Sequence, residues 1–184
     1  MPSVDIDKIR KGCALIVDGL GLGHDEHTKF TAYRFYRALV ELLHYHIIDE
    51  EPKVKLFPAK GIDDIIIVKD IPFTSLCSHH LLIFEGVVHV AYLPGQKIIG
   101  LSKIPRIVDY FSKRPQVQEK LANDIADYLM KVLEPQGVMV IVEGRHSCAA
   151  CRGVRKDHTF ITSAIRGVFS DQSIRQEVLM LLRR

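Results

Sequence analysis

Thiol and imidazole side chains gather in two short stretches of this chain. The first stretch, 71–82, holds one cysteine and two neighbouring histidines, and the second, 144–155, holds one histidine and two cysteines. In chain order these residues are Cys77, His79, His80, His146, Cys148 and Cys151. Thiolate sulfur and imidazole nitrogen at such short spacings are ligands that suit zinc.

The spacing indicates how these side chains would share one ion. Cys77 and His80 are three residues apart, so a turn after a strand can point both at one place. His146 and Cys148 are two apart and would face the same side of a strand. Cys77, His80 and Cys148 then make three ligands with one position left for water, whose pKa zinc lowers to about 7. His79 and His146 remain as proton carriers. A structural site with four ligands stays open as the alternative.

Basic and polar side chains accompany the two stretches and indicate an anionic ligand. The planar guanidinium of arginine can donate two parallel hydrogen bonds to phosphate oxygens, and the ammonium group of lysine attracts them by its charge. The basic residues are Lys103, Arg106, Arg152 and Arg155, with Arg34 and Arg37 upstream. Gln118 and Glu119 form a polar pair at the start of an expected helix. One carboxylate can accept two parallel N–H bonds from a guanine edge.

The composition is that of an ordinary globular protein, with 47% hydrophobic and 26% charged residues among 184. The formal net charge of +3 is too small to indicate nucleic acid. No run reaches the ~18 apolar residues of a membrane span, and the first residues lack an apolar signal region. We therefore expect a cytoplasmic protein that binds neither nucleic acid nor membrane. The length predicts one domain over 1–184, with a helical part at 1–60 and a catalytic core at 61–184.

Hydrophobic periodicity predicts the elements that position these residues. Helices are expected at 28–46, 102–111, 117–133 and 173–184, and apolar residues also recur at helical spacing within 3–24. Strands are expected at 62–71, 84–93, 138–142 and 159–169. Pro94 and Gly95 would turn the strand 84–93 back into a hairpin with 97–101. The order predicts an α+β fold with an antiparallel sheet, whose edges a ring of subunits would cover.

Four motifs together resemble one enzyme family, GTP cyclohydrolase I. They are Cys-x-His-His, GLSK, RPQVQE and HxCxxxRG, and they lie within 75–82, 89–121 and 146–169. The resemblance covers most of the chain from about residue 62 onward. It implies the tunnelling fold, or T-fold, in which a four-stranded antiparallel sheet carries helices on one face. It also implies a ring-forming homo-oligomer, a decamer of two pentamers, with active sites between subunits.

The resemblance further implies a substrate, a cofactor and roles for residues. The substrate would be GTP, the cofactor zinc (Zn2+), and the products formate and 7,8-dihydroneopterin triphosphate, on the path to tetrahydrofolate and other pteridines. Position by position, Cys77, His80 and Cys148 match the zinc ligands. His146 and His79 match the catalytic acid–base residues.

The substrate contacts follow in the same way. Gln118 and Glu119 match the pair that grips guanine. The triphosphate and ribose contacts are matched by Ser102, Lys103, Arg106 and Arg152. Arg34 resembles an arginine that a neighbouring subunit donates, and Arg37 resembles a nearby basic contact.

Three positions depart from the family pattern. Ser78 stands where the family usually has Glu, which removes a carboxylate beside two expected site groups. Ala32 stands where the family's Thr-Pro-x-Arg helix has proline. Cys151 is an additional thiol that competes for zinc, forms a disulfide after metal loss, or stays reduced as a bystander. Two alternatives therefore remain: an enzyme that stops after ring opening or takes a related purine, and a zinc-stabilised protein without turnover.

Overall fold

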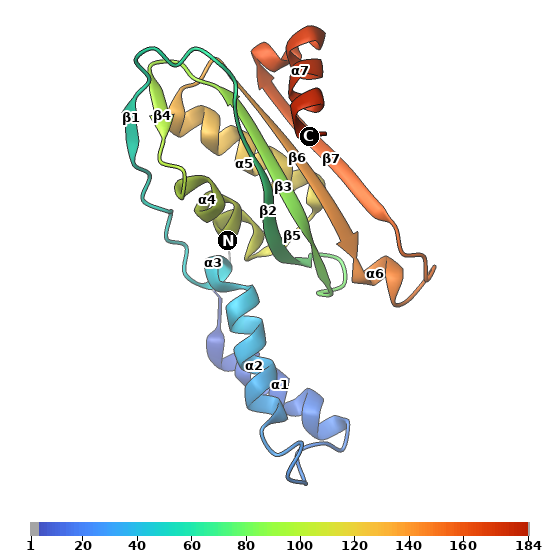
Figure 1. Cartoon of the computed structure of the whole chain (residues 1–184). Coiled ribbons are helices and arrows are strands. Elements are labelled where there is room, and N and C mark those ends of the chain that lie inside the picture. Colours follow the sequence, from blue (N-terminus) through green and yellow to red (C-terminus); the bar gives the residue numbers. More distant parts are fainter. Residues whose placement is uncertain (1–3, 184) are drawn as a thin grey trace.

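A mixed sheet in the order β5-β2-β3-β6-β7 forms the body of the molecule, which the computed structural model describes over residues 4–183 (Figure 1). Its antiparallel strands are β2 (Ile66–Cys77), β3 (Ile83–Leu93), β6 (Gly137–His146) and β7 (Thr159–Gly167). β5 (Pro115–Gln116) runs parallel to β2 at the edge. Four antiparallel strands are therefore present as predicted, and β5 makes the whole sheet mixed.

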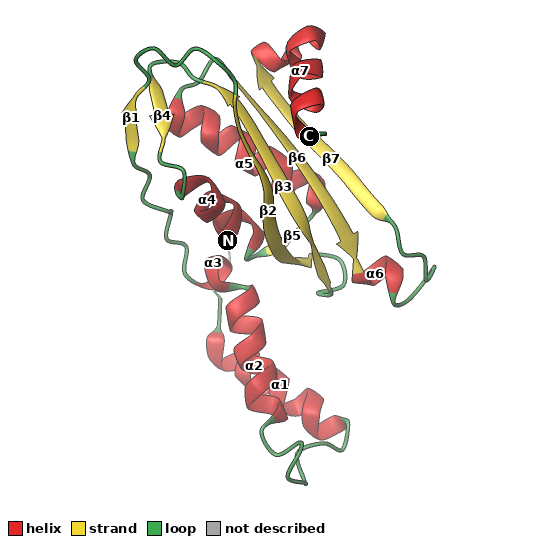
Figure 2. Cartoon of the chain, viewed as in Figure 1, coloured by secondary structure: helices red, strands yellow, loops and turns green. Residues whose placement is uncertain are grey.

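Helices lie against parts of this sheet, and two of them extend away from one end of it (Figure 2). They are α1 (Ile6–Gly19), α2 (Thr31–Leu42), α3 (His44–Ile47), α4 (Lys103–Ser112), α5 (Gln118–Leu133), α6 (Ser147–Ala150) and α7 (Gln172–Leu182), with a 3-10 turn η1 at Val168–Ser170. The helices predicted near 102–111, 117–133 and 173–184 are confirmed. Residue 3 and Arg184, the outer ends of two predicted segments, lie outside the described residues.

The helix predicted at 28–46 is confirmed for most of its length but is not continuous, because this stretch forms α2 and α3 with a break at Leu43. After the break, the backbone N–H of Tyr45 donates to the carbonyl of Lys113 at the end of α4, at 3.1 Å. The chain is attached to the end of α4 at this point, so the helix does not continue straight past Leu43. The start is also later than predicted, since the side chain of Asp25 accepts from Thr28 N at 3.0 Å and holds a turn there.

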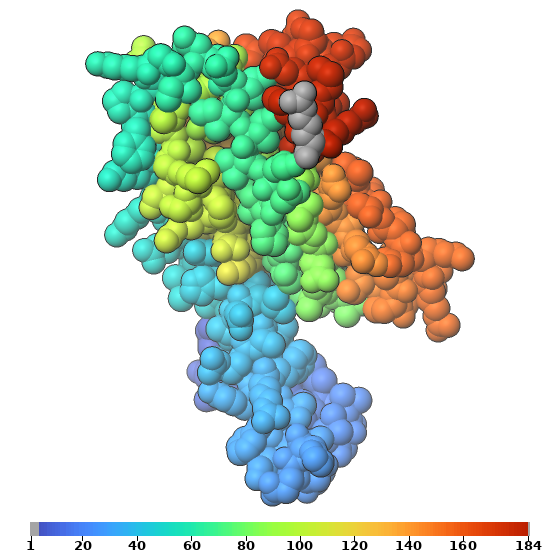
Figure 3. Space-filling view, viewed as in Figure 1, coloured from blue at the N-terminus to red at the C-terminus, as the bar shows by residue number. Residues whose placement is uncertain are grey.

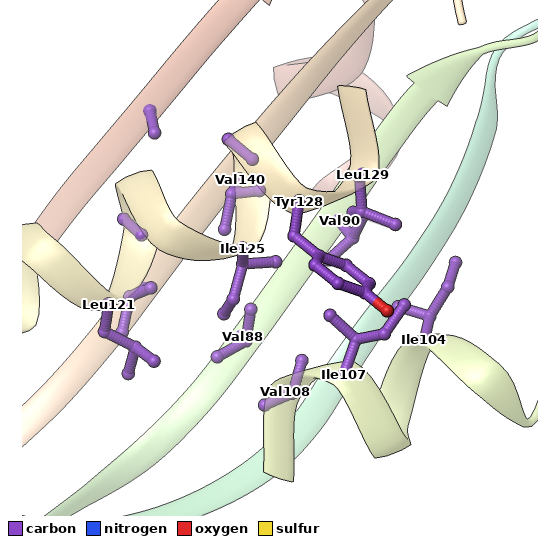
Figure 4. Packing of buried hydrophobic residues seen from close by; sticks show 14 of the residues in the cluster. Val88, Val90, Ile104, Ile107, Val108, Leu121, Ile125, Tyr128, Leu129 and Val140 are labelled. Carbon is purple, nitrogen blue, oxygen red and sulfur yellow. The ribbon is translucent and has the colours of Figure 1, made fainter. Parts of the chain in front are cut away.

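Residues 137–142 of β6 are apolar and buried, because helices cover both faces of the sheet there. Val138, Val140 and Val142 point into the core that α4 and α5 share with the sheet, part of which Figure 4 shows from close by. The alternate residues face the other side and pack in a second cluster with Val178 of α7. The implied arrangement with helices on one face therefore holds for α4 and α5 and is wrong for α7.

The predicted hairpin between 84–93 and 97–101 is also wrong. β4 (Lys97–Ile99) pairs instead with β1 (Leu56–Pro58), in a separate antiparallel ribbon. The strand β3 has no free edge for β4, since Tyr92 is already paired with Ile66 of β2 on one side and with Val138 of β6 on the other. The turn at residues 94–95 therefore leads the chain away from the sheet.

α1 and α2 pack against each other and project from one end of the body (Figures 1 and 3). Asp5 caps α1 by accepting a hydrogen bond from Lys8 N at 3.0 Å. Large apolar side chains stay exposed on this pair, among them Leu15, Leu20 and Phe30. Within residues 4–183, no helix combines the length and the apolar character needed to cross a membrane.

Candidate metal centre and active site

The first site stretch lies in the turn between β2 and β3. Cys77 ends β2, and its backbone N–H donates to Leu82 O at 2.9 Å, which closes the turn. Leu81 adopts a left-handed φ of 52° and donates its N–H to Cys77 O at 2.8 Å. The tight turn carries His79 and His80 beside Cys77, with His79 Nδ1 3.7 Å from Cys77 Sγ. The turn therefore brings the side chain of His79 next to the thiol of Cys77.

The second site stretch begins where β6 ends. His146 is the last residue of β6 and lies opposite Phe84 of β3. The two rings stack, with centroids 4.5 Å apart. The chain then enters α6, so Cys148 lies on a helix, and the prediction that His146 and Cys148 share one side of a strand is wrong. The sequence Ser-Cys-Ala-Ala that follows His146 suits a helical turn, in which alanine is the best helix former.

Cys77, His146 and Cys148 offer ligand atoms that all lie within 4.8 Å of one another. Two sulfurs and one imidazole nitrogen are a donor set for zinc and related divalent ions, so these side chains fit a metal. His80, the predicted third ligand, lines the same cavity but is not part of this group among residues 4–183. Burial raises the pKa of the Cys148 thiol, and the adjacent Cys77 raises it further. Binding of an ion at neutral pH therefore releases a thiol proton.

Gln118, the first residue of α5, is only 1% exposed and fixes the ring of His146. Its Nε2 donates to Val142 O at 3.0 Å and to Phe160 O at 2.8 Å. Its Oε1 lies 2.9 Å from His146 Nε2. Flipping the amide would set its oxygen against two carbonyl oxygens, so the hydrogen is on His146 Nε2, which donates. Nδ1 of His146 is then free to bind an ion or to accept a proton.

Gly144 provides the space for this amide. A Cβ atom at position 144 would lie 2.3 Å from Gln118 Oε1. Any side chain there would displace the amide from His146. The close approach of α5 to β6 therefore requires glycine at this position.

The electrostatic surroundings favour a neutral imidazole at His146. Burial lowers the pKa of His146 below its usual range. The carboxylate of Glu119 opposes this effect, and a charge on His158 adds to it. A neutral ring whose Nε2 is occupied presents Nδ1 as a base at neutral pH.

These groups line one cavity of about 230 Å³. The predicted site residues on its wall are Cys77, His79, His80, Gln118, Glu119, His146 and Cys148. The lining residues that the sequence did not indicate are Gln116, Val117, Ala149, His158 and Phe160. Of these five residues, only His158 carries a titratable side chain. It belongs to none of the four motifs, so its being a histidine was the only feature of the sequence that could have indicated a place in the site.

The predicted phosphate contacts do not line this cavity. Lys103 and Arg106 lie on a separate cavity of about 360 Å³, together with Lys53 from the chain before β1 and the acidic residues Glu50 and Glu51. The guanidinium of Arg34 lies 5.8 Å from the ring centroid of Phe30, on the projecting α2. The remaining predicted contacts outside the cavity wall are Ser102, Arg152 and Arg37. The chain thus has two separate cavities: a metal cavity, which is lined by the thiol–imidazole group, and a basic cavity, which carries Lys103, Arg106 and Lys53 beside two glutamates.

Two departures from the family pattern fall outside the metal group. The side chain of Ser78 is exposed and does not line the cavity, and its backbone N–H donates to Gln116 O at 2.9 Å. Cys151 is exposed, and its Sγ donates to Ser147 O at 2.8 Å. Neither side chain replaces a member of the Cys77 group.

The fold and the site define a class: an α+β protein with a thiol–imidazole centre, suited to a divalent metal, in a cavity at one end of its sheet. The family model described as GTP cyclohydrolase I matches residues 11–183. The chain is 44% identical over 186 residues to "GTP cyclohydrolase 1" of Caldanaerobacter subterraneus subsp. tengcongensis, with 97% of each chain covered. It is 45% identical over 185 residues to that of Aquifex aeolicus, with 98% of each covered. The chain belongs to the GTP cyclohydrolase I family.

One further curated relative and one solved structure complete the comparison. "GTP cyclohydrolase 1" of Brevibacillus brevis is 42% identical over 187 residues and covers 100% of both chains. The apo crystal structure of the archaeosine synthase QueF-Like covers 54% of this chain and 92% of its own, at 20% identity and a TM-score of 0.42. That likeness is too low to bear on the fold or the activity.

Proposed function

We propose that this chain hydrolyses GTP at C8, releases formate and rearranges the remainder to 7,8-dihydroneopterin triphosphate. The observation that carries the proposal is the group of Cys77, His146 and Cys148 on the wall of a cavity that also contains Glu119. This cavity combines a metal donor set, imidazoles for proton transfer and a carboxylate for a guanine edge. Membership of the GTP cyclohydrolase I family supports the same activity.

Cys77 and Cys148 are proposed to hold zinc, with His80 as the third ligand. When bound, such an ion supplies a Lewis acid and an activated water. In this assignment His146 stays unligated and carries protons at Nδ1. Its bond to Gln118 and its lowered pKa support this role, since both keep a neutral ring in a fixed orientation.

Glu119 is proposed to recognise the base. Its carboxylate can accept the two parallel N–H groups of the guanine edge. The neighbouring Gln118 uses both amide hydrogens on backbone carbonyls and its oxygen on His146, so its side chain acts through that ring. His79 is proposed as the second proton carrier, and its place beside Cys77 supports this.

The triphosphate is proposed to lie between subunits. The cavity of about 230 Å³ is smaller than the roughly 300–1,000 Å³ of typical ligand sites, which suits a base better than a whole nucleotide. Lys103 and Arg106 lie on another cavity of the same chain. In a ring of subunits, the basic cavity of one protomer, together with Ser102, Arg34 and Arg37, would serve the metal cavity of its neighbour. Arg152 would act on the metal-cavity side, since its charge lowers the pKa of the Cys148 thiol in the same chain. We propose the decamer of two pentamers as this ring.

The test is to incubate zinc-replete protein with GTP and to measure formate and pterin separately. Equal amounts of formate and dihydroneopterin triphosphate are expected. ATP, which lacks the guanine N–H edge, is the control and should release no formate. Formate without pterin would contradict the rearrangement, and an opened, still formylated purine would place the stop at the second hydration. Unchanged GTP with zinc bound would overturn the proposed activity.

A further inference from the structure

His158 is an imidazole on the wall of the metal cavity to which the family motifs assign no role. It lies outside the group formed by Cys77, His146 and Cys148 among the described residues. It is nevertheless close enough to His146 for its charge to lower the pKa of that ring. The cavity therefore has an additional polar side chain that the metal group does not use.

The segment that carries His158 is tied to the body through the two residues before it. Lys156 N donates to Ala149 O at 3.1 Å, which fastens the segment to α6. Arg145 of β6 donates to Asp157, with Nε 3.1 Å from Oδ1 and a second contact from Nη2. The residue immediately after Asp157 is therefore placed by the sheet, although its own side chain is exposed.

A hydrogen bond also fixes the ring of His158. Its Nδ1 lies 3.0 Å from the carbonyl oxygen of Lys156. A carbonyl oxygen only accepts, so Nδ1 carries the hydrogen and donates it. Nε2 of the neutral ring is then the atom left with a lone pair for a ligand.

We propose that His158 is a substrate-binding residue, whose Nε2 accepts a hydrogen bond from an N–H or O–H group of the nucleoside in the metal cavity. The proposal rests on the proposed function, since it takes GTP as the ligand. His158 stands apart from the thiols, so it acts in binding and not in the bond-making steps. It adds one contact of ordinary strength to those assigned to Glu119.

Two substitutions at position 158 separate a role of Nε2 from the hydrogen bond that Nδ1 makes in the loop. The amide of His158→Asn can keep the donor to Lys156 O but has no group at the position of Nε2. The longer His158→Gln keeps a polar atom there. For His158→Asn we expect KM for GTP to rise about 5- to 10-fold, as for loss of one hydrogen bond, with kcat within about 2-fold. For His158→Gln we expect KM within about 3-fold of the unsubstituted chain.

Val154→Ala, in the same segment but off the cavity wall and 70% exposed, is the matched control and should leave both constants unchanged. Thermal unfolding of each variant checks that the fold is kept. An equal rise in KM for both His158 variants would overturn the proposal by showing that only the loop matters. A fall in kcat at constant KM, or no effect of His158→Asn, would overturn it as well. If the unsubstituted chain releases no formate from GTP, the proposed function itself is contradicted. That outcome differs from those above, in which the unsubstituted chain is active and only the role of His158 is contradicted.

Discussion

Two imidazoles compete for one place beside a pair of thiols. His146 lies within 4.8 Å of the sulfurs of Cys77 and Cys148, whereas the family pattern implies His80 as the ligand. A ligated ring cannot also carry protons, so the assignment decides which histidine does acid–base work. The hydrogen bond from His146 Nε2 to Gln118 favours the assignment of His146 as the proton carrier, because it fixes the ring while Nδ1 stays free.

Metal content tests this assignment. His80→Ala is expected to lower bound zinc from about one ion per chain to a small fraction, because two thiolates alone do not complete a zinc site. His146→Ala is the matched variant and should keep its zinc while losing about 100- to 10,000-fold in kcat. Zinc is measured by mass spectrometry of the metal after gel filtration. The reverse result, with an empty His146→Ala and a loaded His80→Ala, would exchange the two roles.

The contact between Gly144 and Gln118 yields a second prediction at this scale. Gly144→Ala places a Cβ 2.3 Å from Gln118 Oε1 and must push the amide away from His146. We expect kcat to fall about 100-fold, as for a misplacement of about 1 Å near the chemistry, while bound zinc is retained. Gly12→Ala in α1 is the control, since a Cβ there meets nothing within 4 Å. Full activity of Gly144→Ala would show that Gln118 does not position His146.

Residue types and spacing predicted the content of the cavity but not its internal bonds. Cys77, His79, His80, His146 and Cys148 line one cavity, because β2 and β6 end on the same side of the sheet, next to β3, whereas Cys151 stays outside it. No periodicity could indicate that Gln118 from α5 reaches His146, since that contact depends on how closely a helix packs onto a strand. His158 was missed because it lies in the irregular segment between α6 and β7, where no periodic pattern exists.

At the scale of elements, a strand pattern reveals the strand but not its neighbours. Residues 84–93 alternate well and form β3, yet their partners are β2 and β6 instead of the nearby 97–99. The turn at Pro94 was identified correctly, and only the partner was wrong. β1 has three residues and ends at Pro58, too short for a period to appear. Pairing between such distant segments is decided by the packing of the whole sheet.

α7 gives a prediction at this scale, because it covers the face of the sheet opposite α4 and α5. Val178 is 1% exposed in the second apolar cluster. Val178→Ala is expected to lower the free energy of unfolding by about 2 kcal/mol through lost burial and the cavity left behind. Glu177→Ala, its exposed neighbour, should change it by less than about 0.5 kcal/mol. Denaturant titration measures both, and equal effects would mean that α7 is not packed as described.

At the scale of the whole molecule, several surfaces of residues 4–183 have no partner among those residues. β7 is an edge strand of the main sheet, with Ile161 60% exposed. The projecting α1–α2 pair exposes Leu15 and Leu20, at 71% and 68%. Unpaired strand edges and apolar patches are usually covered by a partner. The separation of the basic cavity from the metal cavity points the same way, toward sites shared between copies.

Mixed oligomers test this sharing directly. Cys148→Ala removes a proposed zinc ligand from the metal cavity. A double variant, Lys103→Ala with Arg106→Ala, removes two positive charges from the basic cavity. Each variant alone is expected to be inactive. If one protomer's metal cavity works with its neighbour's basic cavity, refolding the two together at equal amounts restores roughly a quarter of the sites, because head-to-tail contacts form at random. Cys77→Ala mixed with Cys148→Ala is the control and stays inactive, since both residues belong to the metal cavity of one protomer. Recovery in the first mixture alone supports sites between subunits, and no recovery in either places the whole site within one chain.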